Sequence, residues 1–210
     1  MKSDLLSDDQ IEETLAAYRF FPDHSHCEAI RAYISLLLHW NQKVSLTTVV
    51  DPIDILRFHF GESLFAAPSV PIQKGRLADV GSGAGFPGLP LRLAVQDLEV
   101  SLIESNSKKV AFLSEVVRKL RLDHINIVRE RMEEIKNESG KFNYIAARAL
   151  GSHMDLLSWA RKHLAPRGNI VLWVGEDDTR AISNETSWTW SEPIHIPGSM
   201  RRFILIGLTA

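Results

Sequence analysis

The chain has 210 residues, of which 45% are hydrophobic, and its formal net charge is −2 at pH 7. This length and composition suit one α/β domain with a small extra segment, and the charge gives no global sign of a nucleic-acid partner. No run of about 18 apolar residues appears and the sequence starts polar and acidic, so we expect neither a membrane span nor a secretory signal.

The first 70 or so residues are predicted to form a helical N-terminal extension. Apolar residues recur at helical spacing between Ile30 and Leu38, and Asp51-Pro52 marks a break before a second helix over 55–67. Residues 68–75 are predicted to link this extension, 1–70, to a second unit, 71–210. The single cysteine, Cys27, cannot form an internal disulfide, which indicates a reducing, cytoplasmic location.

From Arg76 onward, short apolar runs alternate with helical periods. We predict strands over 76–80, 99–104, 125–129, 142–148 and 169–174, with helices from about Pro87, after Glu104 and over 154–164. This alternation is typical of a parallel sheet with helices on both faces. The tail is predicted to form two strands around Pro197-Gly198, which add an antiparallel edge strand.

A glycine-rich loop, GSGAG, follows the first predicted strand and opens a helix. A loop in this position either is a structural turn or lines the ligand crevice of a doubly wound sheet. It lacks the Gly-Lys-Ser/Thr ending of a phosphate-binding P-loop, and Phe86 stands where a dinucleotide-binding loop needs its third glycine. The loop therefore disfavours ligands with phosphate groups, and it also disfavours a nicotinamide-dependent dehydrogenase.

Glu104 ends the second predicted strand, 23 residues after Gly81, and an acid there accepts hydrogen bonds from a ribose diol. A ribose-bearing ligand without phosphates points to S-adenosylmethionine, whose amino-acid tail would pass over Gly81, Gly83 and Gly85. Asp79 would attract the ammonium of that tail, directly or through water. After the third strand, Met132 would pack on the adenine, and a backbone N–H or Glu133 would form a hydrogen bond with its edge; alternatively, Met132 is a core residue.

The segment after the fourth strand favours one kind of methyl transfer. Residues 147–151 lack the Asp/Asn-Pro-Pro-aromatic turn used on exocyclic amines, and Cys27 lies too far upstream to serve as the nucleophile that pyrimidine C5 requires. Guanine N7 carries a free lone pair, so its methylation requires positioning rather than a catalytic base. Arg148 would bond guanine O6 or a phosphate, or line the cofactor pocket; alternatively, it forms an ordinary ion pair.

The stretch DVGSGAGFPGLPL, followed by IE, ERMEE and AARAL, resembles the RsmG (GidB) family of bacterial 16S rRNA guanine-N7 methyltransferases. The resemblance extends over roughly residues 28–175. It includes Trp40, Asn41, Leu46 and Thr47 in one helical segment, and His59, Glu62 and Ser63 in the next.

The resemblance implies a class I S-adenosylmethionine-dependent methyltransferase fold: Rossmann-like, with a mostly parallel seven-stranded sheet and an antiparallel C-terminal edge strand. It implies 16S rRNA of the small subunit as the substrate. Carried over by position, the cofactor contacts are Gly81, Phe86, Met132, Glu133 and Arg148, with Glu104 as the strand-2 acid. We predict a monomer, no metal site, and phosphate contacts from basic residues near the carboxyl ends of the strands: Arg92, Lys108, Lys109 and Arg148.

Several positions depart from the family pattern. Ser45 replaces an asparagine, Glu62 an aspartate, Phe58 an arginine and Val174 a lysine. The last change removes a cation near the expected RNA face and leaves details of RNA docking open. No catalytic residue is assigned, and His59 and His153 are expected to serve in packing or capping rather than in proton transfer. The alternatives are a small-molecule methyltransferase and a non-catalytic RNA-binding or cofactor-sensing protein.

Overall fold

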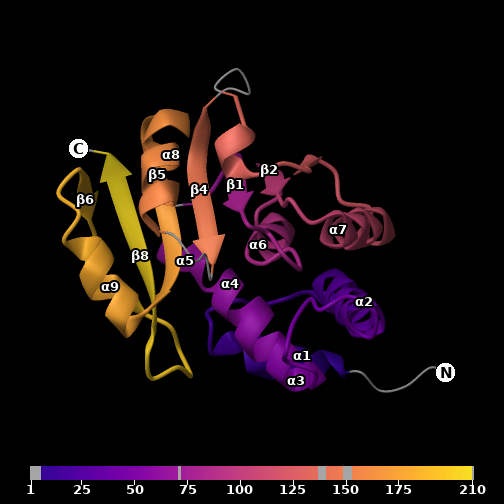
Figure 1. Ribbon diagram of the computed structural model, residues 1–210. Coiled ribbons are helices and arrows are strands. Elements are labelled where there is room, and N and C mark those ends of the chain that lie inside the picture. The colour runs from indigo at the N-terminus through magenta and orange to yellow at the C-terminus, as the bar shows by residue number, and fades with distance from the viewer. Residues whose placement is uncertain (1–5, 71, 137–140, 149–152, 210) are drawn as a thin grey trace.

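The computed structural model describes residues 6–70, 72–136, 141–148 and 153–209. These residues build an eight-stranded sheet in the order β3-β2-β1-β4-β5-β8-β6, with β7 also pairing with β8 (Figure 1). The first five strands run parallel, as the alternating pattern predicted. They are β1 (Gly75–Val80), β2 (Leu98–Ile103), β3 (Ile125–Val128), β4 (Phe142–Arg148) and β5 (Leu164–Gly175).

The C-terminal side of the sheet differs from the prediction. The hairpin around Pro197-Gly198 is present, with β7 (Ile194–His195) antiparallel to β8 (Arg202–Thr209), and β8 is antiparallel to β5. However, β8 is not the edge strand, because β6 (Trp188–Trp190) pairs with its outer side and raises the strand number from seven to eight. Three residues are too few to show a strand period, and the polar helix α9 (Glu176–Ser183) before β6 was not predicted.

The N-terminal extension is helical, and its second half contains a π-helical segment. Ser7 caps α1 (Asp8–Ala16) and Asp23 caps α2 (His24–Asn41), each with a side chain that accepts a hydrogen bond from the third residue of the helix. The helix predicted over 55–67 is present within a longer run of helical backbone: α3 (Pro52–Ile55), the π-helix η1 (Leu56–Gly61) and α4 (Glu62–Leu64) follow one another directly, and α5 (Ala66–Ser69) comes after Phe65.

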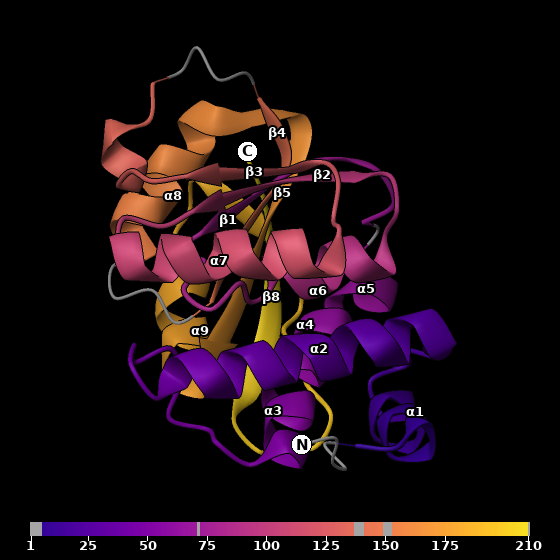
Figure 2. The same ribbon diagram turned by 90° about the vertical axis from the view of Figure 1, so that its right-hand side faces the viewer.

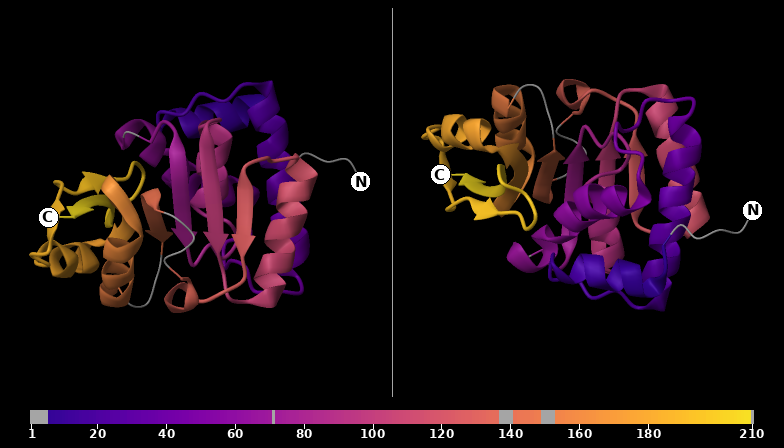
Figure 3. Two further views of the ribbon diagram at one scale, coloured as in Figure 1. Left: turned by 90° about the horizontal axis from the view of Figure 1, so that it is seen from above. Right: turned by 90° about the horizontal axis from the view of Figure 1, so that it is seen from below.

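Helices cover both faces of the sheet. One face carries α6 (Gly88–Ala94), α7 (Ser107–Leu120) and the N-terminal helices, with α2 lying alongside α7 (Figure 2). The other face carries α8 (His153–His163) and α9. In both views of Figure 3 the yellow C-terminal segment lies at the left edge of the molecule, and the indigo N-terminal helices extend toward its right. One apolar cluster contains buried residues of both the N-terminal helices and the sheet. The two predicted units therefore differ in secondary structure on either side of residue 70, but they share a hydrophobic core.

The parallel strands end at one edge of the sheet, where ligands bind in this class of fold. The glycine loop follows β1, Glu104 follows β2, the 3-10 helix η2 (Met132–Glu134) follows β3, and Arg148 ends β4. In Figure 1 the arrowhead of β4 points to this edge, toward α4. Within the described residues, no helix is both long and apolar enough to cross a membrane.

Candidate functional site

The three glycines of the loop hold a backbone conformation that other residues adopt at a cost. Their φ angles are +72° at Gly81, +56° at Gly83 and +87° at Gly85. The loop is fastened to the neighbouring strand, because the backbone N–H groups of Gly81 and Ser82 both donate to the carbonyl of Ile103, at 2.9 and 3.1 Å. The chain therefore makes a tight, fixed turn between β1 and α6.

A side chain at position 85 and one at position 83 would meet different surroundings. A Cβ on Gly85 would lie 2.3 Å from the Tyr33 hydroxyl and 2.6 Å from Leu89, so the protein itself fills that space. Apart from Gly83 and its two chain neighbours, a Cβ on Gly83 would meet only the Gly81 carbonyl within 4 Å among the described residues, at 3.7 Å. The open side of the loop is therefore at Gly83, the position where the sequence predicts that the tail of a ligand would pass.

Asp79, near the end of β1, is bonded to the backbone that follows the loop. Its side chain is fully buried, and Oδ2 accepts a hydrogen bond of 2.9 Å from the N–H of Gly88, the first residue of α6. Oδ1 is buried and has no hydrogen-bond partner among the described residues. Burial raises the pKa of Asp79 to about 7. A buried acceptor lacking a donor beside the open loop fits a cationic group there, as the sequence predicted for the ammonium of S-adenosylmethionine.

Replacing Asp79 by asparagine should remove a pH dependence of stability. The carboxyl of an unfolded chain titrates near 3.9, whereas that of folded Asp79 titrates near 7. Between these values only the folded protein holds the proton, so the free energy of unfolding falls as pH rises. In urea denaturation, the free energy of unfolding of the wild type should fall by about 2–3 kcal/mol more than that of D79N when the pH is raised from 5 to 8. Parallel pH dependence of the two proteins would contradict a buried Asp79 that is neutral at pH 5.

Glu104 lies against the same loop. Its Oε2 accepts a 3.0 Å hydrogen bond from the N–H of Gly83, and its Oε1 accepts one of 2.8 Å from the N–H of Asn106. Each carboxylate oxygen has a second lone pair, so the predicted bonds to a ribose diol remain available. Met132 is buried in the apolar cluster that contains Val80 and Ile103, the last residues of β1 and β2. Glu133 is exposed beside it.

Phe86 turns its side chain toward the N-terminal extension. Its ring stacks on Tyr33 at 5.3 Å and on His59 at 4.9 Å, and meets Phe60 edge-on at 5.3 Å. The hydroxyl of Tyr33 also donates a 2.5 Å hydrogen bond to the carbonyl of Ala84. The N-terminal helices therefore hold the glycine loop in place, a function that the sequence pattern of Tyr33, an apolar helix position, did not reveal.

Replacing Tyr33 by phenylalanine should weaken cofactor binding. The change deletes a buried donor and leaves the Ala84 carbonyl unpaired, which typically costs about 1–3 kcal/mol. We expect a lower melting temperature and a three- to ten-fold higher Kd for S-adenosylmethionine in calorimetry. Y18F is the matched control, since the Tyr18 ring is buried over Gly61 instead of the loop. An unchanged Kd in Y33F would show that this hydrogen bond does not position the loop.

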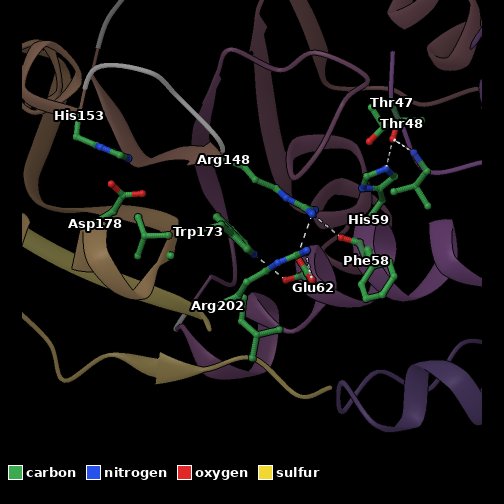
Figure 4. Close-up of a pocket in the computed structure, with 14 residues that line it drawn as sticks. Thr47, Thr48, Phe58, His59, Glu62, Arg148, His153, Trp173, Asp178 and Arg202 are labelled. Carbon is green, nitrogen blue, oxygen red and sulfur yellow. Dashed lines mark hydrogen bonds and ion pairs between the residues drawn. The ribbon is translucent and has the colours of Figure 1, made fainter. Parts of the chain in front are cut away.

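A pocket of about 450 Å³ opens between the N-terminal extension and the ends of β4 and β5 (Figure 4), and one of its lining residues, His59, stacks on Phe86 of the loop. Arg148 lies within the pocket, and its Nη2 donates to the Phe58 carbonyl at 2.5 Å and to Glu62 Oε2 at 2.9 Å. Arg202 donates from Nη1 to Glu62 Oε1 at 2.5 Å. Arg148 therefore forms the ion pair that was the alternative to a ligand contact, yet its Nη1 has no partner among the described residues. Ala149, Leu150 and Gly151, which follow it, lie outside those residues.

The two histidines of the pocket differ in surroundings. His59 is stacked on Phe86, and its Nε2 lies 2.7 Å from Thr47 Oγ1. Burial lowers the pKa of His59 to about 4, so the ring is neutral near pH 7 and is not a proton donor there. His153 lines the other side of the pocket, near Asp178 (Figure 4). The packing role predicted for His59 agrees with these contacts.

The predicted basic residues do not all reach the ligand edge. Lys108 and Lys109 lie in the first turn of α7, at the carboxyl edge of the sheet, and Lys108 is exposed. The placement of Arg92 was wrong. The helix α6 starts at that edge and runs away from it, so Arg92 in its last turn is buried at the opposite edge, where it pairs with Asp123 ahead of β3. We therefore exclude Arg92 from the candidate site.

Comparisons with known proteins identify the family of the chain. The model of the family described as rRNA small subunit methyltransferase G, GidB, matches residues 26–198. Ribosomal RNA small subunit methyltransferase G of Chloroflexus aggregans is 32% identical over 93% of this chain and 87% of its own length. The protein of that name from Xanthomonas euvesicatoria is 32% identical over 84% and 83%.

Solved structures share the fold at low identity. A ribosomal protein L11 methylase from Lactobacillus delbrueckii superposes with a TM-score of 0.62 at 16% identity, over 73% of this chain and 79% of its own. The glycopeptide N-methyltransferase MtfA complexed with sinefungin gives 0.60 at 11%, over 72% and 87%. The fold is thus that of class I S-adenosylmethionine-dependent methyltransferases. Because the family model covers more than half of the sequence and the relatives exceed 30% identity, the chain belongs to the GidB family of rRNA small subunit methyltransferases G.

Proposed function

We propose that this protein methylates N7 of a guanine in the 16S rRNA of the small ribosomal subunit. The observation that carries the proposal is the juxtaposition of two sites at one sheet edge: the glycine loop, open at Gly83, and the pocket that contains Arg148. The cofactor is S-adenosylmethionine, which supplies a methyl group on a positively charged sulfur when bound. The family relatives, named for small-subunit rRNA, support the substrate.

In this proposal the loop and its neighbours hold the cofactor. The backbone of Gly81 to Gly85 borders the amino-acid tail, and Asp79 balances its ammonium from beneath the loop. Glu104 accepts from the ribose hydroxyls with the lone pairs that Gly83 and Asn106 leave free. Met132 and Glu133 border the adenine. Phe86, whose side chain packs on Tyr33 and His59, contributes through its backbone and by fixing the turn.

The pocket is suited to guanine N7, which attacks through a free lone pair and releases no proton from that atom. The protein then has to hold the base in line with the methyl group, and it does not need a residue that removes a proton first. A neutral His59 is consistent with this requirement. Arg148 would donate to guanine O6 or to a phosphate, and Lys108 and Lys109 would contact phosphates of the surrounding rRNA.

We also propose that the protein acts as a monomer in the cytoplasm, where its ribosomal substrate is made. Its exposed large apolar side chains, such as Phe21 and Met200, come from separate parts of the described chain and not from one element. The helical extension, 1–70, serves in this proposal as a support for the cofactor loop and as one wall of the pocket.

A methyl-transfer assay separates this function from its alternatives. The protein is incubated with labelled S-adenosylmethionine and either small ribosomal subunits, large subunits or a panel of small-molecule acceptors. We expect label in 16S rRNA of the small subunit alone. Label in a small molecule would favour a small-molecule methyltransferase, and no label despite cofactor binding would favour a non-catalytic protein.

A further inference from the structure

Glu62 lies buried between two arginines that come from distant strands. Its side chain is 3% exposed, and its two oxygens accept from Arg148 at the end of β4 and from Arg202 at the start of β8. The indole N–H of Trp173 on β5 donates to the Glu62 backbone carbonyl at 2.7 Å. The acid is therefore fixed at both its backbone and its side chain (Figure 4).

The charges of this trio do not cancel. One carboxylate faces two guanidinium groups, so the cluster retains one positive charge at the pocket wall. Burying such groups is costly unless their hydrogen bonds are satisfied, and removing the shared acid would leave two neighbouring cations unopposed. Arg202 is also held from its other side, with its guanidinium 5.5 Å from the centre of the Phe58 ring.

The contacts of Arg148 are unequal at its two terminal nitrogens. Nη2 donates both to the Phe58 carbonyl and to Glu62, whereas Nη1 is buried and has no partner among the described residues. A buried guanidinium donor without an acceptor is costly, so a partner from outside the chain would be bound strongly there. Because the guanidinium is planar, the two bonds at Nη2 also determine where Nη1 points.

We propose that Glu62 is a positioning residue for the target guanine nucleotide: its carboxylate sets Arg148 so that Nη1 meets an acceptor oxygen of that nucleotide. This inference rests on the proposed function and adds a residue to it. Both oxygens of Glu62 already accept from arginines, so Glu62 acts on the substrate through Arg148. Guanine O6 and a phosphate oxygen share the required acceptor chemistry.

The test is E62Q, which keeps the shape and one acceptor oxygen but removes the charge. We expect methylation of small subunits to slow at least ten-fold in kcat, while the Kd for S-adenosylmethionine stays within two-fold of wild type. Subunit binding should be retained, with a steeper salt dependence, because Arg202 is released from its partner and gains a phosphate contact. A merely structural role would not separate binding from turnover in this way.

E176Q is the matched control, since Glu176 also pairs with arginines, Arg180 and Arg201, but at the surface of α9. It should leave kcat and salt dependence within two-fold. If E62Q fails to fold, the double variant E62Q/R202Q replaces it, because removing Arg202 restores the net charge of the cluster. The same ten-fold loss in kcat is expected. Methylating short guanine-containing RNA with and without the phosphate 5′ to the target distinguishes O6 from phosphate as the acceptor.

A wild-type rate in the folded E62Q variant would overturn the inference while leaving the proposed function intact. A Kd for S-adenosylmethionine that rises in parallel with the loss of rate would also overturn it, because Arg148 would then be set by Glu62 to contact the cofactor, as the family resemblance implies, and not the nucleotide. Failure of the wild-type protein to methylate 16S rRNA would instead refute the proposed function, so the two failures are distinguishable.

Discussion

Replacing Gly83 by valine should raise the Kd for S-adenosylmethionine at least 100-fold. The φ of +56° at this position is disfavoured for any L-residue, and most for a β-branched one. The new side chain would also occupy the open side of the loop, where the Gly81 carbonyl, 3.7 Å from a Cβ, is the nearest described atom beyond the two neighbouring residues. The N–H of Gly83 that donates to Glu104 would shift as well, so the tail and ribose contacts would be lost together.

The control for this change is G198V, because Gly198 has a similar φ of +72° in the turn between β7 and β8. Both variants are expected to lose stability, but only G83V should lose cofactor binding in isothermal titration calorimetry. G83A, with a smaller side chain, should show an intermediate Kd. Wild-type affinity in folded G83V would mean that the cofactor does not pass over this loop.

Replacing Arg148 by alanine should reduce kcat/KM for small subunits about 100-fold, the order of loss that follows when one preorganised hydrogen-bond donor is removed from an active site. The fold should survive, because Glu62 keeps its ion pair with Arg202 and its carbonyl bond from Trp173. R148K should recover little, since a lysine cannot bond Phe58 and Glu62 while also presenting a third donor in a fixed plane.

R180A, which removes an exposed arginine of α9 paired with Glu176, controls for a general loss of positive charge. It should leave kcat/KM within two-fold. Methylation rates are measured with excess S-adenosylmethionine, and circular dichroism checks the fold of each variant. Turnover at the wild-type rate in R148A would remove Arg148 from the site.

The parallel part of the fold could be predicted because each element carries its own local signal. The strand predicted over 142–148 has those bounds in the structure, since a short apolar run between polar segments is visible in the sequence alone. The glycine loop and Glu104 were placed at one sheet edge for the same reason: consecutive parallel strands must end together. The strand β6, with three residues, and the polar α9 carried too little signal.

The contacts that complete the site could not be predicted, because they join residues far apart in the chain. Glu62 and Arg202 are separated by 140 positions, and no local pattern pairs them. Tyr33 looked like one more apolar position of a helix, yet its hydroxyl fixes the loop. Arg92 was wrongly predicted to contact RNA for a geometric reason. The helix α6 begins at the ligand edge and runs away from it, so a residue in its last turn lies far from that edge.

The most direct test of the central claim is nucleoside mass spectrometry of 16S rRNA. Small subunits lacking the modification are incubated with isotopically labelled S-adenosylmethionine and the protein, and the digested rRNA is analysed. The account predicts a labelled 7-methylguanosine peak that requires the wild-type protein and is absent with G83V. Labelled methyl groups on any other base or atom, or no labelled nucleoside from subunits that bind the protein, would contradict it.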